Sequence, residues 1–538
     1  MTIELHGMAD SGARQNLTSL VQDQFARRLF DRDATLWGEA AAAEAAIRLG
    51  WTNLSSLSGL IEEISVLRAE LAARGIDRVV LCGMGGSSLA PAVIRRWAGV
   101  ELEIIDSTHP DVMRRALGGD LDRTVVVVSS KSGGTIETRS HRAAFTAAFE
   151  AAGCDPVDHL VIVTDPGSPL ESDARAAGQR VFLADPEVGG RFSALTAFGL
   201  VPAGLAGADL HTIVDDAVAA RDELRVNSES NPGLRLAAWL AAGPPETYVL
   251  GVLQAEDAQW ELGSWIEQLI AESTGKDGRG ILPIALADDA PEVQQPPSNT
   301  RLVRVGAKGD DSADERIADV RAPLGAQFLL WEVATAALGQ LLAIDPFNQP
   351  DVESAKIAAR EQLDQSTEPT AVAELVSFPG VSVLERADAT SDLLHGSLPE
   401  SPEALVARLR DMVAPGGYLA IQAYLDPEGP YAAGLSKLRD ALAATLGAPV
   451  ALGWGPRYLH STGQLHKGGP ALGAFLQLLE VPGAPLGIPG TRNSFNTLIA
   501  AQARGDREVL SERGRPVLAL ECLDPGDAAR RLVVALRT

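Results

Sequence analysis

Short buried strands that alternate with helices run through the sequence from residue 77 onward, and this alternation restricts the fold more than any other feature. The segments VVLC, VVVV and LVIV are apolar on both faces, and a helical pattern follows each of them. Strands of this kind belong to parallel sheets that helices cover on both sides. The pattern therefore predicts α/β architecture with doubly wound parallel sheets.

The length of the chain indicates several such units. At about 150 residues per domain, 538 residues correspond to roughly three or four domains or subdomains. A second buried strand series starts at ETYVLGVLQ, and a polar connector follows near residue 361. We expect a helical N-terminal segment (1–60), a first domain (61–225), the first part of a second domain (226–374) and a C-terminal α/β region (375–538). That last region either completes the second domain or forms a third lobe.

Charge and composition exclude several classes of function. The formal net charge is −25, which disfavours binding to nucleic acid or to an anionic membrane. A phosphate site in such a chain has to be made locally from Lys, Arg and backbone N–H groups. The N-terminus has no apolar signal region, and no run of about 18 apolar residues occurs, so we expect a cytoplasmic protein. Cys82, Cys154 and Cys522 have no metal-type spacing and are expected to be reduced thiols.

Two loops rich in small and hydroxyl-bearing residues follow strands of the first predicted sheet. The loop GMGGSSLAP (83–91) contains Gly86 and Ser87 at the start of a helix, where an anion is favoured. Taken alone it also fits a structural turn or a dinucleotide-binding loop, although its spacing is G-x-G-G-S-S. The loop SSKSGGTIET (129–138) offers one ammonium and several hydroxyls, which also fit the capping of a helix. Because both loops lie at the carboxyl ends of strands, we expect them to share one ligand site.

Five segments in chain order resemble the glucose-6-phosphate isomerase family, whose sugar isomerase (SIS) domains bind sugar phosphates. Besides the two loops, they are GGRFSALTAFGL (189–200), AESTGKDGRG (271–280) and DPFNQPDVESAK (345–356). The chain is most similar to the isomerase portion of bifunctional transaldolase/isomerase proteins, without a transaldolase part. The resemblance implies two SIS-type domains, with the helical N-terminal and α/β C-terminal segments as extensions.

The resemblance also implies a role for individual residues. The phosphate is expected to be held by Gly86, Ser87, Ser130, Lys131, Ser132, Thr135 and Thr138, with Gln349 near the phosphate and sugar. Glu272 would move the proton between C1 and C2, which needs a single carboxylate base. Arg191 would stabilise the enediolate, because a fixed guanidinium acts most strongly where negative charge develops. Without the resemblance, Glu272 also fits a solvated helix end, and Arg191 fits a surface ion pair.

Ring opening is assigned in the family to a lysine and a histidine. Lys356 falls at the family position, although it also follows Glu353 at the spacing of an intrahelical pair. The family histidine is expected between the segments of Glu272 and Lys356, but that interval contains no histidine. The segment STGQLH makes His466 the first candidate and His460 the second, and either of them also fits a packing role.

The resulting expectation is an isomerase that interconverts D-glucose 6-phosphate and D-fructose 6-phosphate. No metal or organic cofactor is expected, since a carboxylate suffices for the proton transfer. A homodimer is expected by family analogy. The alternatives are an isomerase for mannose 6-phosphate or an amino sugar phosphate, a non-catalytic SIS sugar-phosphate sensor, and a dinucleotide-dependent oxidoreductase.

Overall fold

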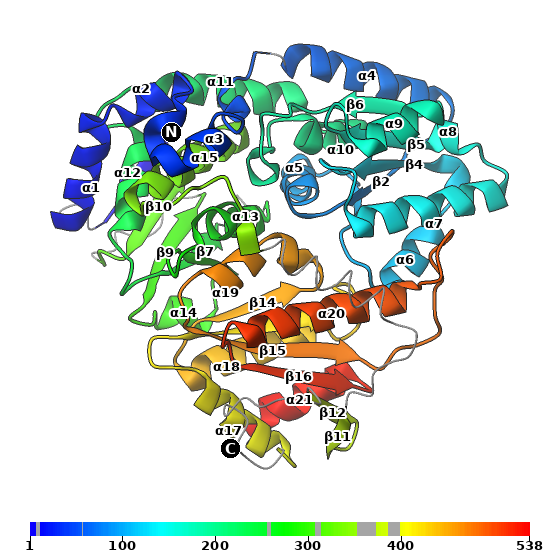
Figure 1. Cartoon of the computed structure of the whole chain (residues 1–538), viewed down its shortest axis with the longest axis vertical. Helices are drawn as coiled ribbons and strands as arrows, with labels where there is room; N and C mark the ends of the chain where they lie inside the picture. Colours follow the sequence, from blue (N-terminus) through cyan, green and yellow to red (C-terminus); the bar gives the residue numbers. More distant parts are fainter. Residues whose placement is uncertain are drawn as a thin grey trace.

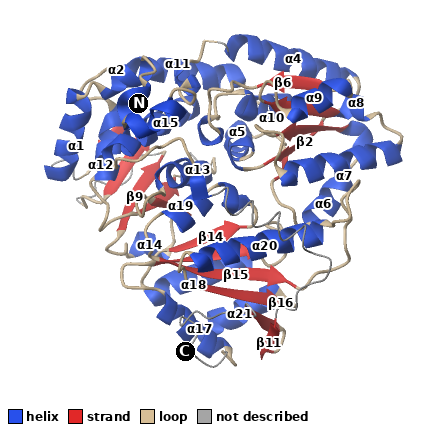
Figure 2. Ribbon diagram, viewed as in Figure 1, coloured by secondary structure: helices blue, strands red, loops and turns tan. Residues whose placement is uncertain are grey.

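The computed structural model describes residues 1–6, 11–55, 57–255, 260–306, 314–351, 373–385 and 399–537, without the side chains of 373–377 and 385. Three β-sheets, each covered by helices, form three lobes (Figures 1 and 2). In Figure 1 the first lobe lies at the upper right, the second at the upper left and the third below both. The predicted α/β class with parallel sheets and helices on both faces is confirmed.

The first lobe contains a five-stranded parallel sheet in the order β3-β2-β4-β5-β6. Its strands are β2 (Arg78–Gly83), β3 (Glu103–Ile105), β4 (Thr124–Ser129), β5 (Leu160–Thr164) and β6 (Arg180–Leu183). Its helices are α4 (Leu57–Ala73), α5 (Leu89–Ala98), α6 (Pro110–Leu117), α7 (Ile136–Ala152), α8 (Pro156–His159), α9 (Pro169–Ala176) and α10 (Ala197–Ala206).

The apolar run VVVV is buried on both sides of this sheet. Val125 and Val127 belong to one core with residues of α4, α5 and α10, while Val126 and Val128 belong to another core with residues of α6 and α7. Successive side chains of a strand point to opposite faces, so a doubly covered strand has to be apolar throughout. Because the strands are parallel, their carboxyl ends lie at one edge of the sheet, and the two predicted loops begin there.

The second lobe contains a sheet in the order β1-β10-β9-β7-β8, in which only β1 is antiparallel. Its strands are β1 (Thr2–Leu5), β7 (Val249–Gln254), β8 (Leu282–Leu286), β9 (Thr300–Val305) and β10 (Ile317–Arg321). Its helices are α1 (Ser11–Gln22), α2 (Phe25–Phe30), α3 (Glu39–Ala45), α11 (Leu210–Leu224), α12 (Pro232–Ala241), α13 (Leu262–Thr274), α14 (Pro291–Gln294) and α15 (Leu324–Leu341). The N-terminal segment, expected to be helical, thus also supplies an edge strand.

The third lobe has a six-stranded sheet of its own, in the order β11-β12-β16-β15-β13-β14. The strands β11 (Ala373–Phe378) and β12 (Val381–Glu385) are antiparallel, and β13 (Tyr418–Tyr424), β14 (Val450–Trp454), β15 (Gly473–Glu480) and β16 (Val517–Cys522) are parallel. Its helices are α17 (Pro402–Met412), α18 (Ala432–Leu446), α19 (Gly463–Gly468), α20 (Phe495–Glu512) and α21 (Pro525–Ala535). The described part of the C-terminal region therefore forms a separate sheet and does not extend the second one.

Apolar side chains join the third lobe to the other two. Phe495 and Leu498 of α20 belong to the same core as Val126 of the first lobe. Tyr418 and Phe475 share a core with residues of the second lobe, including Ala271 of α13. Figure 1 shows α20 lying on the side of the third sheet that faces the first lobe. The site described below lies where these contacts meet.

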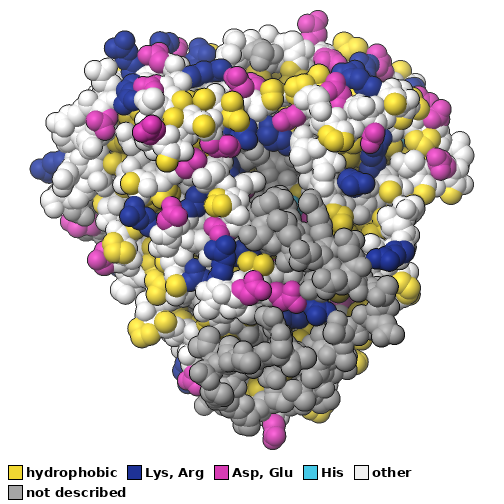
Figure 3. Space-filling model, viewed as in Figure 1, with side chains coloured by type: hydrophobic (Ala, Val, Ile, Leu, Met, Phe, Trp, Pro, Cys, Tyr) yellow, Lys and Arg dark blue, Asp and Glu magenta, His cyan; other side chains and the backbone are white. Residues whose placement is uncertain are grey.

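The surface and the helices give two further findings. Acidic and basic side chains are interspersed over the face shown in Figure 3, with hydrophobic side chains scattered between them. Among the helices that the structure describes, none is both long enough and apolar enough to cross a bilayer.

Candidate active site

A cleft of about 540 Å³ lies at the junction of the three lobes. The loops after β2 and β4, the short helix η5 (Gly190–Phe192), α13, the short helix η8 (Arg457–His460) and α20 contribute to its walls. Ten of the predicted residues or their alternates line it: Gly86, Ser87, Ser130, Lys131, Ser132, Thr135, Arg191, Glu272, Gln349 and His460. Residues from all three lobes therefore face one cavity.

The loop after β4 supplies hydroxyls and one ammonium to the cleft. Ser130 Oγ donates to Thr135 Oγ1 at 3.2 Å, and Ser132 Oγ accepts from the backbone N–H of Gly134 at 3.2 Å. Thr135 is the N-cap of α7, and its side chain makes no capping bond. The helix N-terminus adds unpaired N–H groups and a positive dipole end to the loop. This combination suits an anionic group.

Two members of this loop are engaged with protein partners. The ammonium of Lys131 pairs with the carboxylate of Asp165 and donates to the carbonyl oxygen of Pro186 at 3.3 Å. Burial raises the pKa of Asp165, against the effect of this ammonium. Thr138 does not line the cleft, because its hydroxyl donates to the Thr135 carbonyl at 3.0 Å within α7. Its predicted contact with a phosphate is therefore not supported.

Glycine is required in the loop after β2 because other backbone passes close to it. A Cβ atom on Gly86 would lie 1.9 Å from the carbonyl oxygen of Gly190. Gly85 has φ = +55°, and a Cβ there would meet the carbonyl oxygen of His460 at 2.7 Å. The loop thus packs against the segments that carry Arg191 and His460. We conclude that these glycines let the walls of the cleft approach one another.

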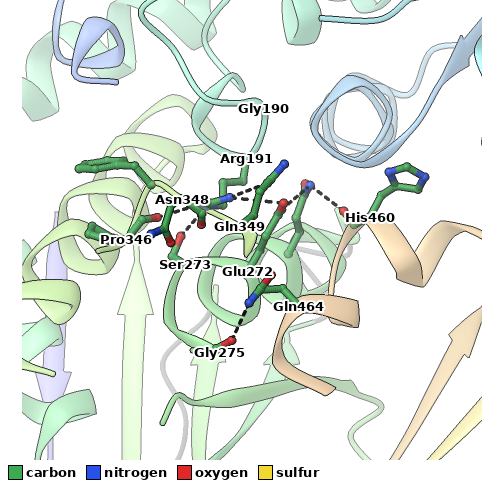
Figure 4. Close-up of polar contacts among 12 residues, drawn as sticks. Gly190, Arg191, Glu272, Ser273, Gly275, Pro346, Asn348, Gln349, His460 and Gln464 are labelled. Carbon is green, nitrogen blue, oxygen red and sulfur yellow. Dashed lines mark hydrogen bonds and ion pairs between the residues drawn. The ribbon is translucent and has the colours of Figure 1, made fainter. Parts of the chain in front are cut away.

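Arg191 is buried at the base of the cleft and is fixed by several partners (Figure 4). Its guanidinium donates to Ser273 Oγ at 2.8 Å, to Gln349 Oε1 at 3.0 Å, and to the carbonyl oxygens of Pro346 and Asn348 at 2.7 and 3.0 Å. Its Nη1 also lies 3.3 Å from Glu272 Oε1. Burial lowers the pKa of Arg191, although the Glu272 carboxylate opposes this effect.

Glu272 lies in the last turn of α13 and is only 5% exposed. Besides Arg191, it accepts a hydrogen bond from Gln268 Nε2 at 3.1 Å. Gln268 is one helical turn earlier, and the same Nε2 donates to the carbonyl oxygen of His460 at 2.8 Å. The carboxylate is therefore held by two neighbours and faces the cleft.

His460 lines the cleft, whereas His466 does not. The ring of His466 is buried and its Nδ1 bonds with the hydroxyl of Tyr418 at 2.9 Å. It stacks on Tyr418 and meets Phe475 edge-on, and burial lowers the pKa of His466 to about 3. The preference for His466 is therefore corrected in favour of His460. His466 instead packs in the third lobe against Tyr418 and Phe475.

A buried carboxylate that was not predicted orients His460. Nε2 of His460 lies 3.0 Å from Glu137 Oε1, and Gln502 Nε2 donates to the same oxygen at 2.7 Å. The Oε1 of Gln502 in turn accepts from Thr108 Oγ1 at 2.6 Å. Burial raises the pKa of Glu137, but the charge and hydrogen bond of His460 outweigh it, so the pKa lies below the ordinary value. A glutamate in the first turn of a helix ordinarily serves the helix dipole, which is why no pattern in the sequence pointed to this role.

The other predicted groups lie outside the cleft or outside the described residues. Lys356 is not among the described residues. Lys276, in the same segment as Glu272, is buried and donates to the carbonyl oxygen of Asp345, and burial lowers its pKa well below the ordinary value. Within the described part of the chain, the one group of three metal-type ligands is His109, Asp111 and Glu480, none of which lines the cleft.

Comparison with known proteins finds relatives that match parts of the chain. A glucose-6-phosphate isomerase from Synechococcus sp. (strain JA-3-3Ab) is 37% identical over 206 residues, which is 36% of this chain and 39% of that protein. A glucose-6-phosphate isomerase from Thermus thermophilus is 29% identical over 387 residues, covering 60% of this chain and 92% of that protein. Over these spans the chain is similar to members of the glucose-6-phosphate isomerase family, and it covers about two fifths of the length of the first of these relatives. No family model matches its sequence.

Two solved structures are similar to this chain over about two thirds of its length. A hypothetical protein from Thermus thermophilus is 27% identical with a TM-score of 0.56, covering 67% of this chain and all of that one. A glucose-6-phosphate isomerase from Chlamydia trachomatis has a TM-score of 0.53 at 20% identity, covering 66% and 86% of the two chains. The second likeness concerns the fold alone. About a third of this chain therefore lies outside each match.

Proposed function

We propose that the protein interconverts D-glucose 6-phosphate and D-fructose 6-phosphate through ring opening and a cis-enediolate. The observation that carries the proposal is the contact of Glu272 with Arg191, 3.3 Å apart at the base of a cleft whose other wall is the Ser-Lys-Ser loop. A carboxylate next to a fixed guanidinium suits a reaction that moves one proton and builds negative charge on oxygen. The names of the relatives agree with this activity.

The phosphate would bind at the loop after β4 and the start of α7. Ser130, Ser132 and Thr135 offer hydroxyls there, and Ser87 faces them from the loop after β2. Lys131 would exchange part of its contact with Asp165 for the substrate phosphate. Placing a dianion there also agrees with the favourable end of the helix dipole.

Ring opening would be performed by His460, with Glu137 as its positioning residue. Proton transfer is needed at the ring oxygen and at the anomeric hydroxyl, and an imidazole is suited to both transfers near neutral pH. The carboxylate of Glu137 holds the ring by its Nε2 and stabilises the imidazolium when it forms. Lys356 stays a proposed second group for this step on the basis of the family resemblance.

The proton transfer would be performed by Glu272. The carboxylate removes the proton from C2 of the open aldose and returns it to C1, and Arg191 stabilises the enediolate oxygens between the two steps. Because Arg191 is already fixed by four acceptors besides Glu272, it needs little reorganisation when charge develops. The reaction proposed here uses only groups of the protein.

A coupled assay with glucose 6-phosphate, fructose 6-phosphate and mannose 6-phosphate side by side tests the proposal. We expect turnover of the first pair in the unmodified protein, and near-complete loss of it in Glu272→Gln with substrate binding retained. Glu261→Gln is the matched control, because Glu261 is exposed at the other end of α13. Near-normal turnover in Glu272→Gln would contradict the mechanism, and faster turnover of mannose 6-phosphate would reassign the substrate.

We further infer a cytoplasmic homodimer that binds neither nucleic acid nor membrane. The homodimer follows from family analogy, and the lack of polyanion binding follows from the net charge of −25. Sedimentation at several protein concentrations tests the dimer. A single species with the mass of one chain would contradict it.

A further inference from the structure

The short helix η8 (Arg457–His460) carries the proposed ring-opening histidine, and it is held at both of its ends. At the inner side, the hydroxyl of Tyr458 donates to the buried Asp506 at 2.5 Å and also bonds with Tyr424 at 2.8 Å. At the cleft, His460 contacts Glu137 through its ring and Gln268 through its carbonyl oxygen. The position of its imidazole therefore depends on how η8 is fixed.

The first residue of η8 makes a two-pronged ion pair with the first lobe. Arg457 Nη2 donates to Asp106 Oδ1 at 2.9 Å, and Arg457 Nε lies 2.6 Å from Asp106 Oδ2. Asp106 comes directly after β3 and is 5% exposed. Arg457 Nε makes no hydrogen bond at this distance, so one hydrogen bond and the ion contact together hold the guanidinium beside Asp106. Arg457 thus ties the helix of His460 to the sheet edge beside the phosphate-binding lobe.

This pair does not touch the space where substrate would lie. Arg457 and Asp106 line a second cavity of about 640 Å³, and neither lines the cleft with Glu272. Any effect of the pair on the reaction must consequently pass through other residues, either through η8 from Arg457 or from Asp106 along the chain to Thr108, whose hydroxyl donates to Gln502. This property separates a positioning role from a catalytic one.

The chain contains a matched pair that joins the same two lobes without touching η8. Arg115 of α6 bonds with both carboxylate oxygens of Asp426, at 2.7 and 3.0 Å. Asp426 lies after β13 and is also well buried. Arg115 lines the same second cavity. Arg115 makes two hydrogen bonds in its pair and also contacts Glu428, whereas Arg457 makes one, so the control pair is at least as strongly bonded and differs in what it holds.

We propose that the Arg457–Asp106 pair positions His460 for ring opening, whereas the Arg115–Asp426 pair only joins the lobes. The inference rests on the proposed function, because it assigns a residue pair to one step of that reaction. The pair contacts neither the phosphate loop nor Glu272, which is linked to η8 only through Gln268, so it should affect ring opening most and leave substrate binding nearly unchanged.

Exchange between the α and β anomers of glucose 6-phosphate measures ring opening directly, since neither anomer can convert without opening. We would follow this exchange by NMR in the full chain carrying Glu272→Gln, in which the later proton transfer is blocked. In that background we expect Arg457→Gln and Asp106→Asn to slow protein-catalysed exchange about ten- to a hundredfold, the size expected from misplacing a catalytic group by about 1 Å. Arg115→Gln should slow it less than about threefold, within the ordinary scatter of a merely structural change.

Two further measurements separate positioning from loss of structure. Arg457→Lys keeps the positive charge but loses the planar guanidinium with its several N–H donors. The rate of anomer exchange in this variant should therefore lie between the rates with Arg457 and with Arg457→Gln. In the chain with Glu272 intact, kcat should fall in Arg457→Gln while KM changes little, and its melting temperature should match that of Arg115→Gln. If Arg457→Gln does not fold, Asp106→Asn decides the question in the same assays.

The outcomes distinguish this inference from the function on which it rests. An unmodified protein that does not isomerise glucose 6-phosphate would overturn the proposed function. A protein that does isomerise it, but in which Arg457→Gln and Arg115→Gln slow anomer exchange equally, would overturn only the positioning role.

Discussion

Lys131 already has an ion-pair partner in the protein, which holds its ammonium in place before a ligand binds. Its ammonium pairs with Asp165 at the wall of the cleft. Replacing it by Met should raise KM for glucose 6-phosphate about tenfold or more and lower kcat less, because a phosphate contact lasts through the whole reaction. Steady-state kinetics of Lys131→Met measure this. A fall in kcat at unchanged KM would contradict it.

The sequence could locate those residues that directly follow an element of fixed geometry, such as the end of a parallel strand. Ser130, Lys131 and Thr135 follow a strand end directly, and parallel strands end at a common edge. The histidine was misplaced because the fold of a short loop decides which of two nearby rings faces the cleft. Gln502 was missed because its partner Glu137 is 365 positions away.

At the scale of elements, helix α15 is apolar along most of its length, and it buries three polar side chains, Gln327, Glu332 and Thr335. It is buried from Leu324 to Gly339, and Glu332 lies inside it with its Oε1 lacking a partner among the described residues. Burial raises the pKa of Glu332 well above 4.5, so the folded state holds a proton that the unfolded state releases. Stability should consequently fall by about 1.4 kcal/mol per pH unit between 4.5 and the folded pKa.

Glu332→Gln tests this directly, because it keeps the shape and removes the ionisation. Its melting temperature should decline less than that of the unmodified protein as pH rises from about 4.5 toward the folded pKa of Glu332, because only the unmodified protein carries the ionisable carboxyl. Glu62→Gln, at an exposed position of α4, should leave the decline unchanged. Parallel curves for the unmodified protein and Glu332→Gln would show that the buried carboxyl is not protonated.

At the scale of the whole molecule, the contact between the second and third lobes depends on a buried ion pair. Arg439 of α18 bonds with Glu292 of α14, and the same carboxylate accepts from the backbone N–H of Val450 at 3.0 Å. Glu292→Ala should destabilise the protein by about 1–3 kcal/mol, because it leaves the N–H of Val450 without its acceptor and removes one of the two carboxylates paired with Arg439. Asp31→Ala breaks an exposed pair and should cost less than about 0.5 kcal/mol. Thermal unfolding that is equal for both variants would contradict the expectation.

The arrangement of lobes was only partly predictable. The series of strands predicted each sheet, since a strand buried on both faces is a short run of apolar residues. Whether the C-terminal strands would extend the second sheet or form their own was left open, because pairing between strands depends on contacts that distant segments make. The structure has them pair among themselves, with β13 between β14 and β15.

The hydrogen bond between Glu137 and Gln502 can form only late in the synthesis of the chain. Gln502 belongs to α20, so a nascent polypeptide emerging from the ribosome can shape its first two lobes long before this contact exists. A chain truncated before α20 should accordingly still bind phosphate but should not open the sugar ring.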